Sequence, residues 1–427
     1  MAKKIAFKTL GCRLNQYETD TLISQFKKGG FEVVDYKEEA DVYVVNTCTV
    51  TNKSDHKSRN TIQQGKRVKP DAVMLVTGCM ANHRKDQLNA NEQITYVVDN
   101  DRKSSIFSIV DAHFKGELVN PDEYEKDVFG FAVGEETIHT RSLLKIQDGC
   151  DNFCSFCIIP FVRGRAISRP VEEVLENARE LIRIGYKELV ITGVNIGRYD
   201  YEGLLFEDLI EQILALPGDF RVRISSMEPE GFGEKLFSML NHPKLSPHLH
   251  ICLQSGSEAI LLKMRRMYTA RSFSEMVQSI RSVRPDMNLT TDIIVGFPGE
   301  TDEDFQASLD RVKEMGFTHV HTFKYSKRDG TRAARAGDQV PEKVKSARSE
   351  GMRLLSEENK RTYRSSFIGK QQRLIIEKSG NAYSLGLGEH FVPVKVMGKK
   401  LPANSWQLVQ IVGIESGDDP ALIGELL

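Results

Sequence analysis

The sequence predicts an α/β protein built from three successive parts: a Rossmann-like parallel sheet, a partial (β/α)6 TIM-like barrel and a small antiparallel β-barrel. The chain has 427 residues, and at about 150 residues per domain this length suggests roughly three domains. Strand-like apolar runs alternate with helical periodicity over most of the chain, as parallel α/β folds require. The C-terminal part instead holds short strands separated by glycine turns, which is typical of a small β-barrel.

The first domain is expected over residues 1–116. Its strand-like runs are KIAFKT, DVYVVNT and AVMLVTG, with helical stretches between them such as ETDTLISQFKKGG. Parallel strands joined by right-handed crossovers place their carboxyl ends at one edge of the sheet, where open α/β sheets bind ligands. Residues 117–136 then carry seven acidic residues against one basic residue, Lys126, with no sustained period. We therefore predict a linker over residues 117–140.

The second domain is expected over residues 141–363, including a basic helix that connects it to the third. A strand followed by a helix occurs six times, and the strands are LLKIQ, ELVITG, RVRISS, HLHICLQ, LTTDIIVG and THVHTFKY. Six units are two short of a full TIM barrel, so we expect an open partial barrel with its chemistry at the strand carboxyl ends. Residues 364–427 predict an OB-like barrel of the kind that binds oligonucleotides. A barrel that only caps the enzyme is the alternative.

The overall composition is that of an ordinary globular protein, with 40% hydrophobic and 27% charged residues, which excludes disordered and collagen-like chains. The 58 basic and 59 acidic residues give a net charge of −1, so any nucleic acid must be met by a local basic patch. No apolar run approaches the roughly 18 residues of a membrane span, and the opening MAKKIAFKTLGC is too short and polar for a signal peptide. We expect a cytoplasmic protein with no membrane partner.

Seven cysteines, an odd number in a reducing compartment, argue against a disulfide framework. Three of them, Cys150, Cys154 and Cys157, form the run C-x-x-x-C-x-x-C within DGCDNFCSFC. A closed zinc site needs a fourth ligand, and the following IIPFVRGR offers neither cysteine nor histidine. An iron–sulfur cubane held by three cysteines leaves one iron open to a small molecule. The spacing therefore favours a cluster with an open iron.

Three more cysteines each follow one of the first three strand-like runs: Cys12, Cys48 and Cys79. At equivalent ends of parallel strands they could converge on a second cluster, again with one open iron. Small buried residues at strand ends would explain them equally well. The seventh, Cys252, lies within the apolar run HLHICLQSG and is expected to be a buried core residue.

Small and polar residues stand at the ends of the other barrel strands, where they would share one rim with the cysteine loop. Glycines allow close backbone approach, while hydroxyl, amide and carboxylate groups suit a ribose and an amino acid moiety. Turn geometry and helix capping explain any one of them taken alone. The predicted cofactor-binding residues are Gly193, Asn195, Ser225, Ser226, Glu228, Gln254, Ser255, Gly296 and Gly299.

Residues 321–364 hold twelve basic against six acidic residues. Part of this excess falls in a helical segment, where a solvated helix face explains it. The loop before that helix, SKRDGTRAARAG, is basic and contains glycines, which suits phosphate contact. The predicted RNA-binding residues are Arg163, Arg165, Lys327, Arg328, Arg332 and Arg335.

With these motifs in place, the whole chain resembles the radical S-adenosylmethionine methylthiotransferases. The segments GCRLNQYET, NTCTVTNKSDHKSR and TTDIIVGFPGET are most similar to the MtaB-type branch, which methylthiolates threonylcarbamoyl-adenosine next to the tRNA anticodon. The resemblance implies an N-terminal methylthiotransferase domain, a central radical domain and a C-terminal TRAM domain that binds RNA. One departure is Cys252, where the family pattern leads us to expect proline or another small residue.

The resemblance also implies the cofactors and the reaction. Two 4Fe–4S clusters are expected, an auxiliary one on Cys12, Cys48 and Cys79 and a radical one on the cysteine loop, with two molecules of S-adenosylmethionine per turnover. The radical cluster would generate a 5′-deoxyadenosyl radical that activates carbon 2 of N6-threonylcarbamoyladenosine at position 37 of tRNA. The auxiliary cluster would deliver the methylthio group. No acid or base residue is assigned to catalysis, because an aromatic C–H bond is too strong for general base chemistry.

The implied partners are the anticodon loop of the tRNA and an electron donor for the clusters, and a monomer is expected. Other branches of the family act on isopentenyl-adenosine in tRNA or on an aspartate of a ribosomal protein, and both remain alternative substrates. A non-catalytic iron–sulfur protein that binds RNA is an alternative of another class. A nicotinamide oxidoreductase is set aside, because no G-x-G-x-x-G follows the first strand.

Overall fold

The computed structural model describes residues 2–131 and 140–427. The chain divides into two compact units that do not follow the order of the sequence. The first unit takes most of the first 138 residues together with Lys145–Arg169 and Ser326–Ala334. The second unit holds Pro170–Tyr325 and Arg335–Leu427, with the short stretch before Lys145. Each unit is described by itself below.

The first unit contains a five-stranded sheet of order β2-β1-β3-β4-β5, in which every pair is parallel. The strands are β1 (Lys4–Thr9), β2 (Glu32–Val34), β3 (Val42–Thr47), β4 (Val73–Gly78) and β5 (Tyr96–Val98). Every residue of β3 and β4 is buried, because a parallel sheet is covered on both faces and its central strands become continuous apolar runs. The Rossmann-like sheet is thereby confirmed. The edge strands β2 and β5 have three residues each, which is too few for a hydrophobic period to be recognised in the sequence.

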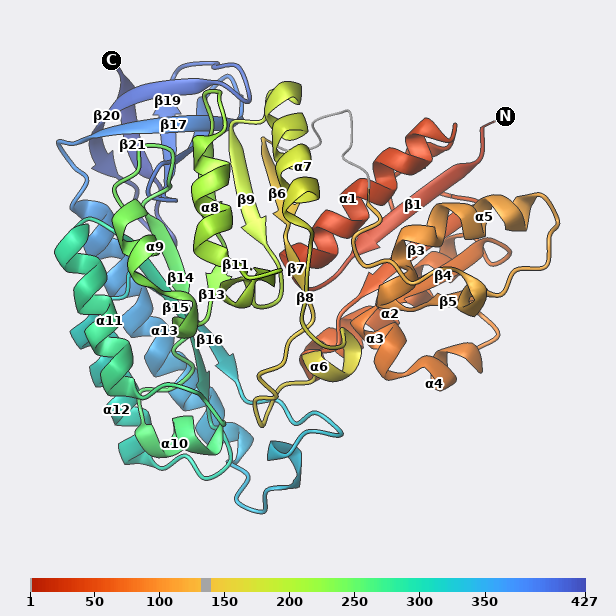
Figure 1. The fold of residues 1–427 in the computed structure, drawn as a ribbon, viewed down its shortest axis with the longest axis horizontal. Coiled ribbons are helices and arrows are strands. Elements are labelled where there is room, and N and C mark those ends of the chain that lie inside the picture. Colours follow the sequence, from red (N-terminus) through yellow and green to blue (C-terminus); the bar gives the residue numbers. More distant parts are fainter. Residues whose placement is uncertain (1, 132–139) are drawn as a thin grey trace. The chain divides into compact units, whose positions relative to one another are not determined.

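Helices cover both faces of this sheet (Figure 1). Tyr43 and Met74 belong to the core on one face, and Phe26 and Leu75 belong to the core on the other. The helices are α1 (Arg13–Lys28), α2 (Asn52–Val68), α3 (Cys79–His83), α4 (Lys85–Asn89), η1 (Asn100–Ser105) and α5 (Ile106–Phe114).

Part of the predicted linker packs on the first unit. It contains a short turn of helix, η2 (Pro121–Glu123), and Phe131 is buried in the same core as Phe26. The rest of the prediction, residues 132–139, lies outside the described residues. The cysteine loop also belongs to the first unit, framed by β7 (Gln147–Asp148), α6 (Ile159–Val162) and β8 (Ile167–Ser168).

The second unit carries the six predicted barrel strands in chain order. They form two sheets, β12-β9-β6 and β13-β14-β15-β16. The pairs β9–β12, β13–β14, β14–β15 and β15–β16 are parallel. The strands are β6 (Arg141–Lys145), β9 (Glu188–Thr192), β12 (Arg221–Ile224), β13 (Ser226–Met227), β14 (His248–Ile251), β15 (Asn288–Val295) and β16 (His319–Lys324). β13 follows β12 after the single residue Ser225, but it pairs in the other sheet. The strands therefore form two sheets, and the barrel stays open. This confirms the partial (β/α)6 barrel.

Helices connect these strands and flank them (Figure 1). They are α7 (Val171–Ile184), α8 (Phe206–Ala215), α9 (Glu234–Met239), α10 (Glu258–Lys263), α11 (Ala270–Val283) and α12 (Asp302–Met315). α7 and α12 end at Gly185 and Gly316 in the left-handed conformation, the usual way for glycine to stop a helix. Shorter elements are η3 (Ile196–Arg198), β10 (Asp200–Tyr201), β11 (Leu204–Leu205), η4 (Pro229–Gly231) and η5 (Ala333–Arg335).

The basic helix α13 (Glu342–Ser365) leads into a closed five-stranded barrel of order β17-β18-β19-β21-β20. The strands are β17 (Gln371–Lys378), β18 (Tyr383–Gly388), β19 (Pro393–Met397), β20 (Trp406–Ile414) and β21 (Leu422–Leu426). The predicted barrel is confirmed with one correction, since β19 and β21 pair in parallel, whereas a wholly antiparallel barrel was predicted. Among the described residues, no helix is both long and apolar enough to cross a membrane.

Candidate functional site

The first three cysteines lie at the carboxyl ends of three neighbouring strands. Cys12 lies in the turn after β1 and is the N-cap of α1. Cys48 directly follows β3, and Cys79 directly follows β4 and begins α3. The turn before Cys12 depends on Gly11, whose φ is +98°. A Cβ added there would stand 2.8 Å from the Cβ of Cys48 and 3.0 Å from its Sγ. Glycine therefore lets the segment with Cys12 lie directly against Cys48.

These three thiols share one electrostatic environment. Cys12 is exposed, while Cys48 and Cys79 are buried. Burial raises the pKa of the Cys48 thiol and raises that of Cys79 to about 11, and in each case the nearby Cys12 adds to the effect. A metal centre takes the place of such thiol protons when it binds. Three convergent thiols are the donor set that an iron–sulfur cluster with one open iron requires, so these residues fit the auxiliary cluster.

The other three ligand candidates, Cys150, Cys154 and Cys157, lie in one loop and are all partly buried. Backbone bonds shape this loop: the Cys150 N–H donates to Gly164 O at 3.1 Å, and the Cys157 N–H donates to Cys154 O at 3.0 Å. Gly149 has a φ of +70°, and a Cβ there would lie 1.9 Å from the carbonyl oxygen of Arg165. The loop thus presents three thiols within eight residues, which fits a second cluster.

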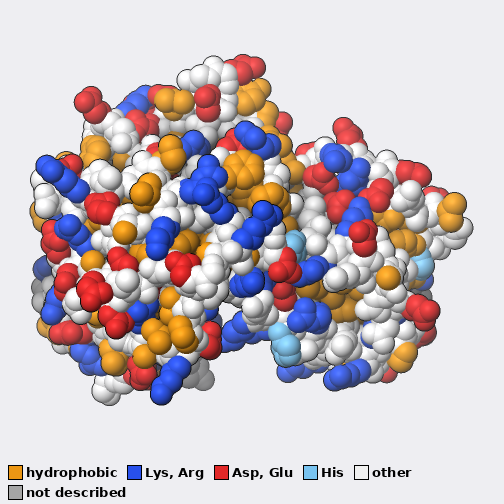
Figure 2. Space-filling model, turned by 90° about the horizontal axis from the view of Figure 1, so that it is seen from below, with side chains coloured by type: hydrophobic (Ala, Val, Ile, Leu, Met, Phe, Trp, Pro, Cys, Tyr) orange, Lys and Arg blue, Asp and Glu red, His pale blue; other side chains and the backbone are white. Residues whose placement is uncertain are grey.

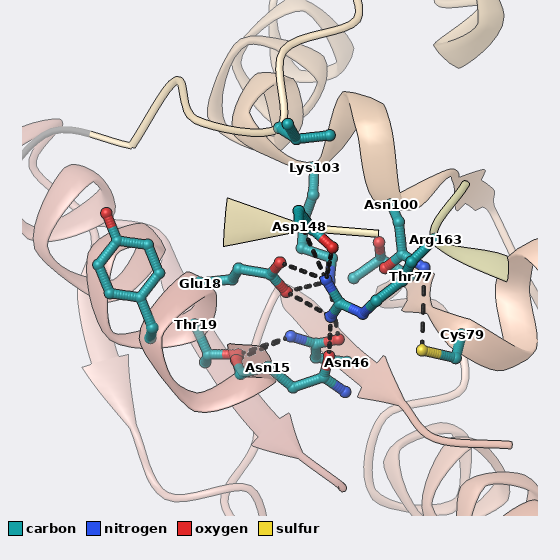
Figure 3. A network of polar contacts seen from close by, with 12 residues as sticks. Asn15, Glu18, Thr19, Asn46, Thr77, Cys79, Asn100, Lys103, Asp148 and Arg163 are labelled. Carbon is teal, nitrogen blue, oxygen red and sulfur yellow. Dashed lines mark hydrogen bonds and ion pairs between the residues drawn. The ribbon is translucent and has the colours of Figure 1, made fainter. Parts of the chain in front are cut away.

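A buried polar network joins the segments that carry both groups of cysteines (Figure 3). The Arg163 guanidinium lies 2.9 Å from Asp148, just before the cysteine loop, and 3.1 Å from Glu18 on α1. It also donates to Asn15 Oδ1 at 2.6 Å. Lys103 and Lys145 pair with the same Glu18 carboxylate. One arginine therefore ties the helix that follows Cys12 to the strand that precedes Cys150.

Burial perturbs the charged groups of this network. Burial alone would raise the pKa of Glu18, but Arg163, Lys103 and Lys145 outweigh it and hold that pKa far below its usual value. The same burial lowers the pKa of the Lys103 ammonium, against the pull of its partner Glu18. Asn100 extends the network, because its Nδ2 donates to Val162 O at 2.8 Å and lies 3.9 Å from Cys79 Sγ.

The basic loop Ser326–Ala334 belongs to the first unit and contacts both cysteine segments. Arg328 pairs with Asp55 at 2.7 Å and donates to Thr49 O at 2.9 Å, one residue after Cys48. The Ala333 N–H donates to Ser155 O at 2.8 Å within the cysteine loop.

Two of the six arginines and lysines predicted to bind RNA are buried inside the protein. Arg163 is 8% exposed and Arg328 is 4% exposed, and both form buried ion pairs, so we withdraw them from that set. The sequence missed these ion pairs because Glu18 and Asp55 lie far from Arg163 and Arg328 along the chain. Lys327, Arg332, Arg335 and Arg165 are exposed. Elsewhere, Lys and Arg side chains alternate with Asp and Glu over the face drawn in Figure 2.

The predicted cofactor residues all lie at the carboxyl ends of barrel strands in the second unit. They fall after β9 (Gly193, Asn195), after β12 (Ser225), at the start of β13 and just after it (Ser226, Glu228), after β14 (Gln254, Ser255) and after β15 (Gly296, Gly299). Gln254 has a φ of +67°, and Gly296 and Gly299 have values of +69° and +74°. These turns shape the rim, as strand ends of barrel enzymes do.

Several rim side chains are held by their neighbours. Glu228 forms an ion pair with Arg266, and Ser255 Oγ accepts from the Ser257 N–H at 3.2 Å. The Gly296 N–H donates to the Glu300 carboxylate at 2.6 Å. The sequence identified these positions from strand ends alone, while the buried charges of Glu18, Lys103 and Lys145 escaped it. For Lys145 the signal was a charged residue inside the apolar strand LLKIQ, whereas Glu18 and Lys103 lie on α1 and η1.

Comparisons with known proteins place these features in a family. Residues 4–99 match the model described as "Uncharacterized protein family UPF0004", and residues 144–312 match the radical SAM superfamily. A solved structure of the radical S-adenosylmethionine methyltransferase TsrM from Kitasatospora setae shares the fold, with a TM-score of 0.58 and 16% identity over 78% of this chain and 77% of that chain.

Curated relatives are similar over most of their length. The threonylcarbamoyladenosine tRNA methylthiotransferase MtaB of Bacillus subtilis is 40% identical over 88% of this chain and 85% of its own. The protein of the same name from Aquifex aeolicus is 35% identical over 93% of this chain and 97% of its own. A tRNA-2-methylthio-N(6)-dimethylallyladenosine synthase from Cereibacter sphaeroides is 32% identical over 93% of each chain. This chain therefore belongs to the radical S-adenosylmethionine tRNA methylthiotransferases, in their MtaB-type branch.

Proposed function

We propose that this protein methylthiolates carbon 2 of N6-threonylcarbamoyladenosine at position 37 of tRNA. The observation that carries the proposal is the presence of two groups of three cysteines in one compact unit, at three strand ends and in one loop. Relatives named for threonylcarbamoyladenosine are 33% to 40% identical, against 32% for those named for dimethylallyladenosine. This difference favours the threonylcarbamoyl substrate.

The six cysteines would hold two 4Fe–4S clusters, an auxiliary one on Cys12, Cys48 and Cys79 and a radical one on Cys150, Cys154 and Cys157. When bound, the clusters and S-adenosylmethionine supply the one-electron chemistry that an aromatic C–H bond requires and that side-chain acids and bases lack. The chain itself orients the two groups of ligands. Arg163 contributes most, because its guanidinium bonds at once to α1 and to Asp148.

The predicted rim residues of the second unit would bind S-adenosylmethionine, two molecules of which are needed per turnover. The turns at Gly296 and Gly299 permit close backbone approach, since φ is positive at both. Asn195 and Ser225 are buried at the ends of β9 and β12 and offer amide and hydroxyl groups for a ribose or an amino acid moiety.

The tRNA anticodon loop would meet exposed basic residues and the C-terminal barrel. Lys327 and Arg332 are exposed on the loop that contacts Thr49 and Ser155, and cations there suit phosphate. On the barrel, Arg373 lies over the Trp406 ring at 3.9 Å, and such stacked surfaces suit bases. We propose residues 364–427 as the TRAM domain, residues 141–363 as the radical domain and residues 1–116 as the methylthiotransferase domain. The clusters also need an electron donor as a partner. We propose that the protein acts as a monomer.

The test is mass spectrometry of tRNA nucleosides from a strain that lacks the gene, with and without complementation. We expect 2-methylthio-N6-threonylcarbamoyladenosine to vanish in the deletion strain and to return with the wild-type gene but not with Cys12→Ala or Cys150→Ala. Persistence of that nucleoside in the deletion strain would refute the substrate. Selective loss of the methylthiolated isopentenyl nucleoside would assign the other branch.

A further inference from the structure

Outside the six cluster cysteines, a thiol, an imidazole and a carboxylate meet in the second unit. His250 is on β14, Cys252 directly follows that strand, and Asp292 is on the neighbouring β15. One ligand atom from each lies within 4.8 Å of the other two. His250 and Cys252 are buried and Asp292 is partly buried. Among the described residues, this is the group whose atoms are close enough to hold one ion.

Two separations among these residues are close to those expected around a tetrahedral zinc ion. Bonds of about 2.0 Å to nitrogen or oxygen and about 2.3 Å to sulfur, at tetrahedral angles, separate two ligand atoms by about 3.3 to 3.7 Å. His250 Nε2 lies 3.2 Å from Asp292 Oδ1, and Cys252 Sγ lies 3.7 Å from Asp292 Oδ2. The two contacts use different oxygens of Asp292. The three ligand atoms, which lie within 4.8 Å of one another, therefore have to move closer together around one carboxylate oxygen when an ion binds.

Neighbouring groups orient the ligands. The Thr290 hydroxyl lies 2.9 Å from His250 Nδ1, which leaves Nε2 as the nitrogen directed at the Asp292 carboxylate. Hydrogen bonds at the non-ligating nitrogen are how protein metal sites fix a histidine ring. The backbone of Cys252 is fixed on both sides, because its N–H donates to Met227 O at 3.0 Å and its carbonyl accepts from the Tyr268 hydroxyl at 2.6 Å.

We propose that His250, Cys252 and Asp292 bind a zinc-type divalent cation. Mixed thiolate, imidazole and carboxylate ligands suit this class of ion, and three protein ligands leave a fourth position open. The ring of His321 on β16 has its centroid 5.3 Å from that of His250, so His321 is a candidate for that position. Binding forms one metal–sulfur bond and releases the Cys252 thiol proton to solvent.

The proposal also explains the departure at Cys252. The family pattern predicts proline or another small residue there, and neither would supply a ligand. A thiol at this position completes the ligand set in this chain. The ligands of this site are not among the six cysteines assigned to the two clusters.

The test measures zinc in the holoenzyme with both clusters assembled, after equilibration with buffered zinc without oxygen. Zinc K-edge absorption reads the ligands of zinc alone, regardless of the iron present. We expect stoichiometric zinc with a single sulfur ligand in the wild type. Cys252→Ala and Asp292→Asn should each lower zinc affinity by at least about tenfold.

The matched control is His319→Gln, which changes a histidine on the adjacent strand β16 that bonds to Ser356 and lies outside the ligand group. This variant should keep its zinc, and equal iron content will show that every variant is folded. Wild-type protein without zinc would overturn the proposal. Zinc with two or more sulfur ligands, or zinc retained by both ligand variants, would do the same, because the ion would then occupy a cysteine cluster site.

Discussion

The two groups of cysteines reach their positions by different routes. Cys150, Cys154 and Cys157 are neighbours in the sequence, and a loop held by its own backbone bonds is enough to gather them. Cys12, Cys48 and Cys79 are gathered only when β1, β3 and β4 pair in register. The three thiols of the cysteine loop thus stay together in any state that keeps the loop. The thiols of Cys12, Cys48 and Cys79 come together only in the folded sheet.

The largest expected effect separates the roles of the two groups. Cys150→Ala should abolish both cleavage of S-adenosylmethionine and methylthiolation, because the loop cluster is lost. Cys12→Ala should abolish methylthiolation and keep reductive cleavage, with roughly half of the iron remaining because one of two four-iron clusters is lost. Iron and sulfide analysis with electron paramagnetic resonance measures which cluster each variant has lost. Equal loss of cleavage in both variants would mean that the two groups do not act separately.

Arg163→Met tests whether the two groups depend on one another. Without the guanidinium, Glu18 and Asp148 stay buried with fewer cationic partners, and breaking such a buried pair costs about 3–5 kcal/mol. We expect the free energy of unfolding to fall by that amount in denaturant titrations, with loss of iron from both groups. Arg165→Met is the control, because Arg165 is exposed and its pair with Asp151 is worth at most about 1 kcal/mol.

Gly11→Ala should weaken only the group that depends on the sheet. The new methyl would press on Cys48, and the positive φ adds a strain of about 1–3 kcal/mol. The auxiliary cluster should then form less completely, while the loop cluster stays intact. Gly30 has a similar positive φ, but a Cβ added there would have no atom within 4 Å. The Gly30→Ala variant therefore reports the effect of backbone strain alone. Matching iron loss in the two variants would argue that strain, and not contact with Cys48, is responsible.

The smallest effect is expected at the surface. Lys327→Ala and Arg332→Ala should each weaken tRNA binding and lower the slope of log affinity against log salt by about 1, with cluster content unchanged. Binding titrations at several salt concentrations measure it. An unchanged slope in both variants would place the RNA elsewhere.

The same contrast explains what the sequence could predict. Strands such as VYVVNT and VMLVTG are continuous apolar runs, so the parallel sheet and its cysteine-bearing edge followed from their pattern. The roles of Arg163 and Arg328 could not be predicted, because their partners Glu18 and Asp55 are 145 and 273 positions away. From the sequence, a buried arginine with a distant carboxylate is indistinguishable from an exposed one that binds phosphate. The parallel pair β19–β21 was missed for a related reason, since strand pairing depends on how the barrel closes.

The ion pair between Asp55 and Arg328 has a consequence for synthesis of the protein on the ribosome. Domains generally fold as the chain emerges, the N-terminal ones first. Here the N-terminal unit cannot be completed until the segments Lys145–Arg169 and Ser326–Ala334 have left the exit tunnel. Until then Asp55 and Glu18 lack their arginine partners, so the nascent sheet remains incompletely folded. A fragment that stops after the first 131 residues is therefore expected to be a poor substitute for the intact unit in any study of the auxiliary site.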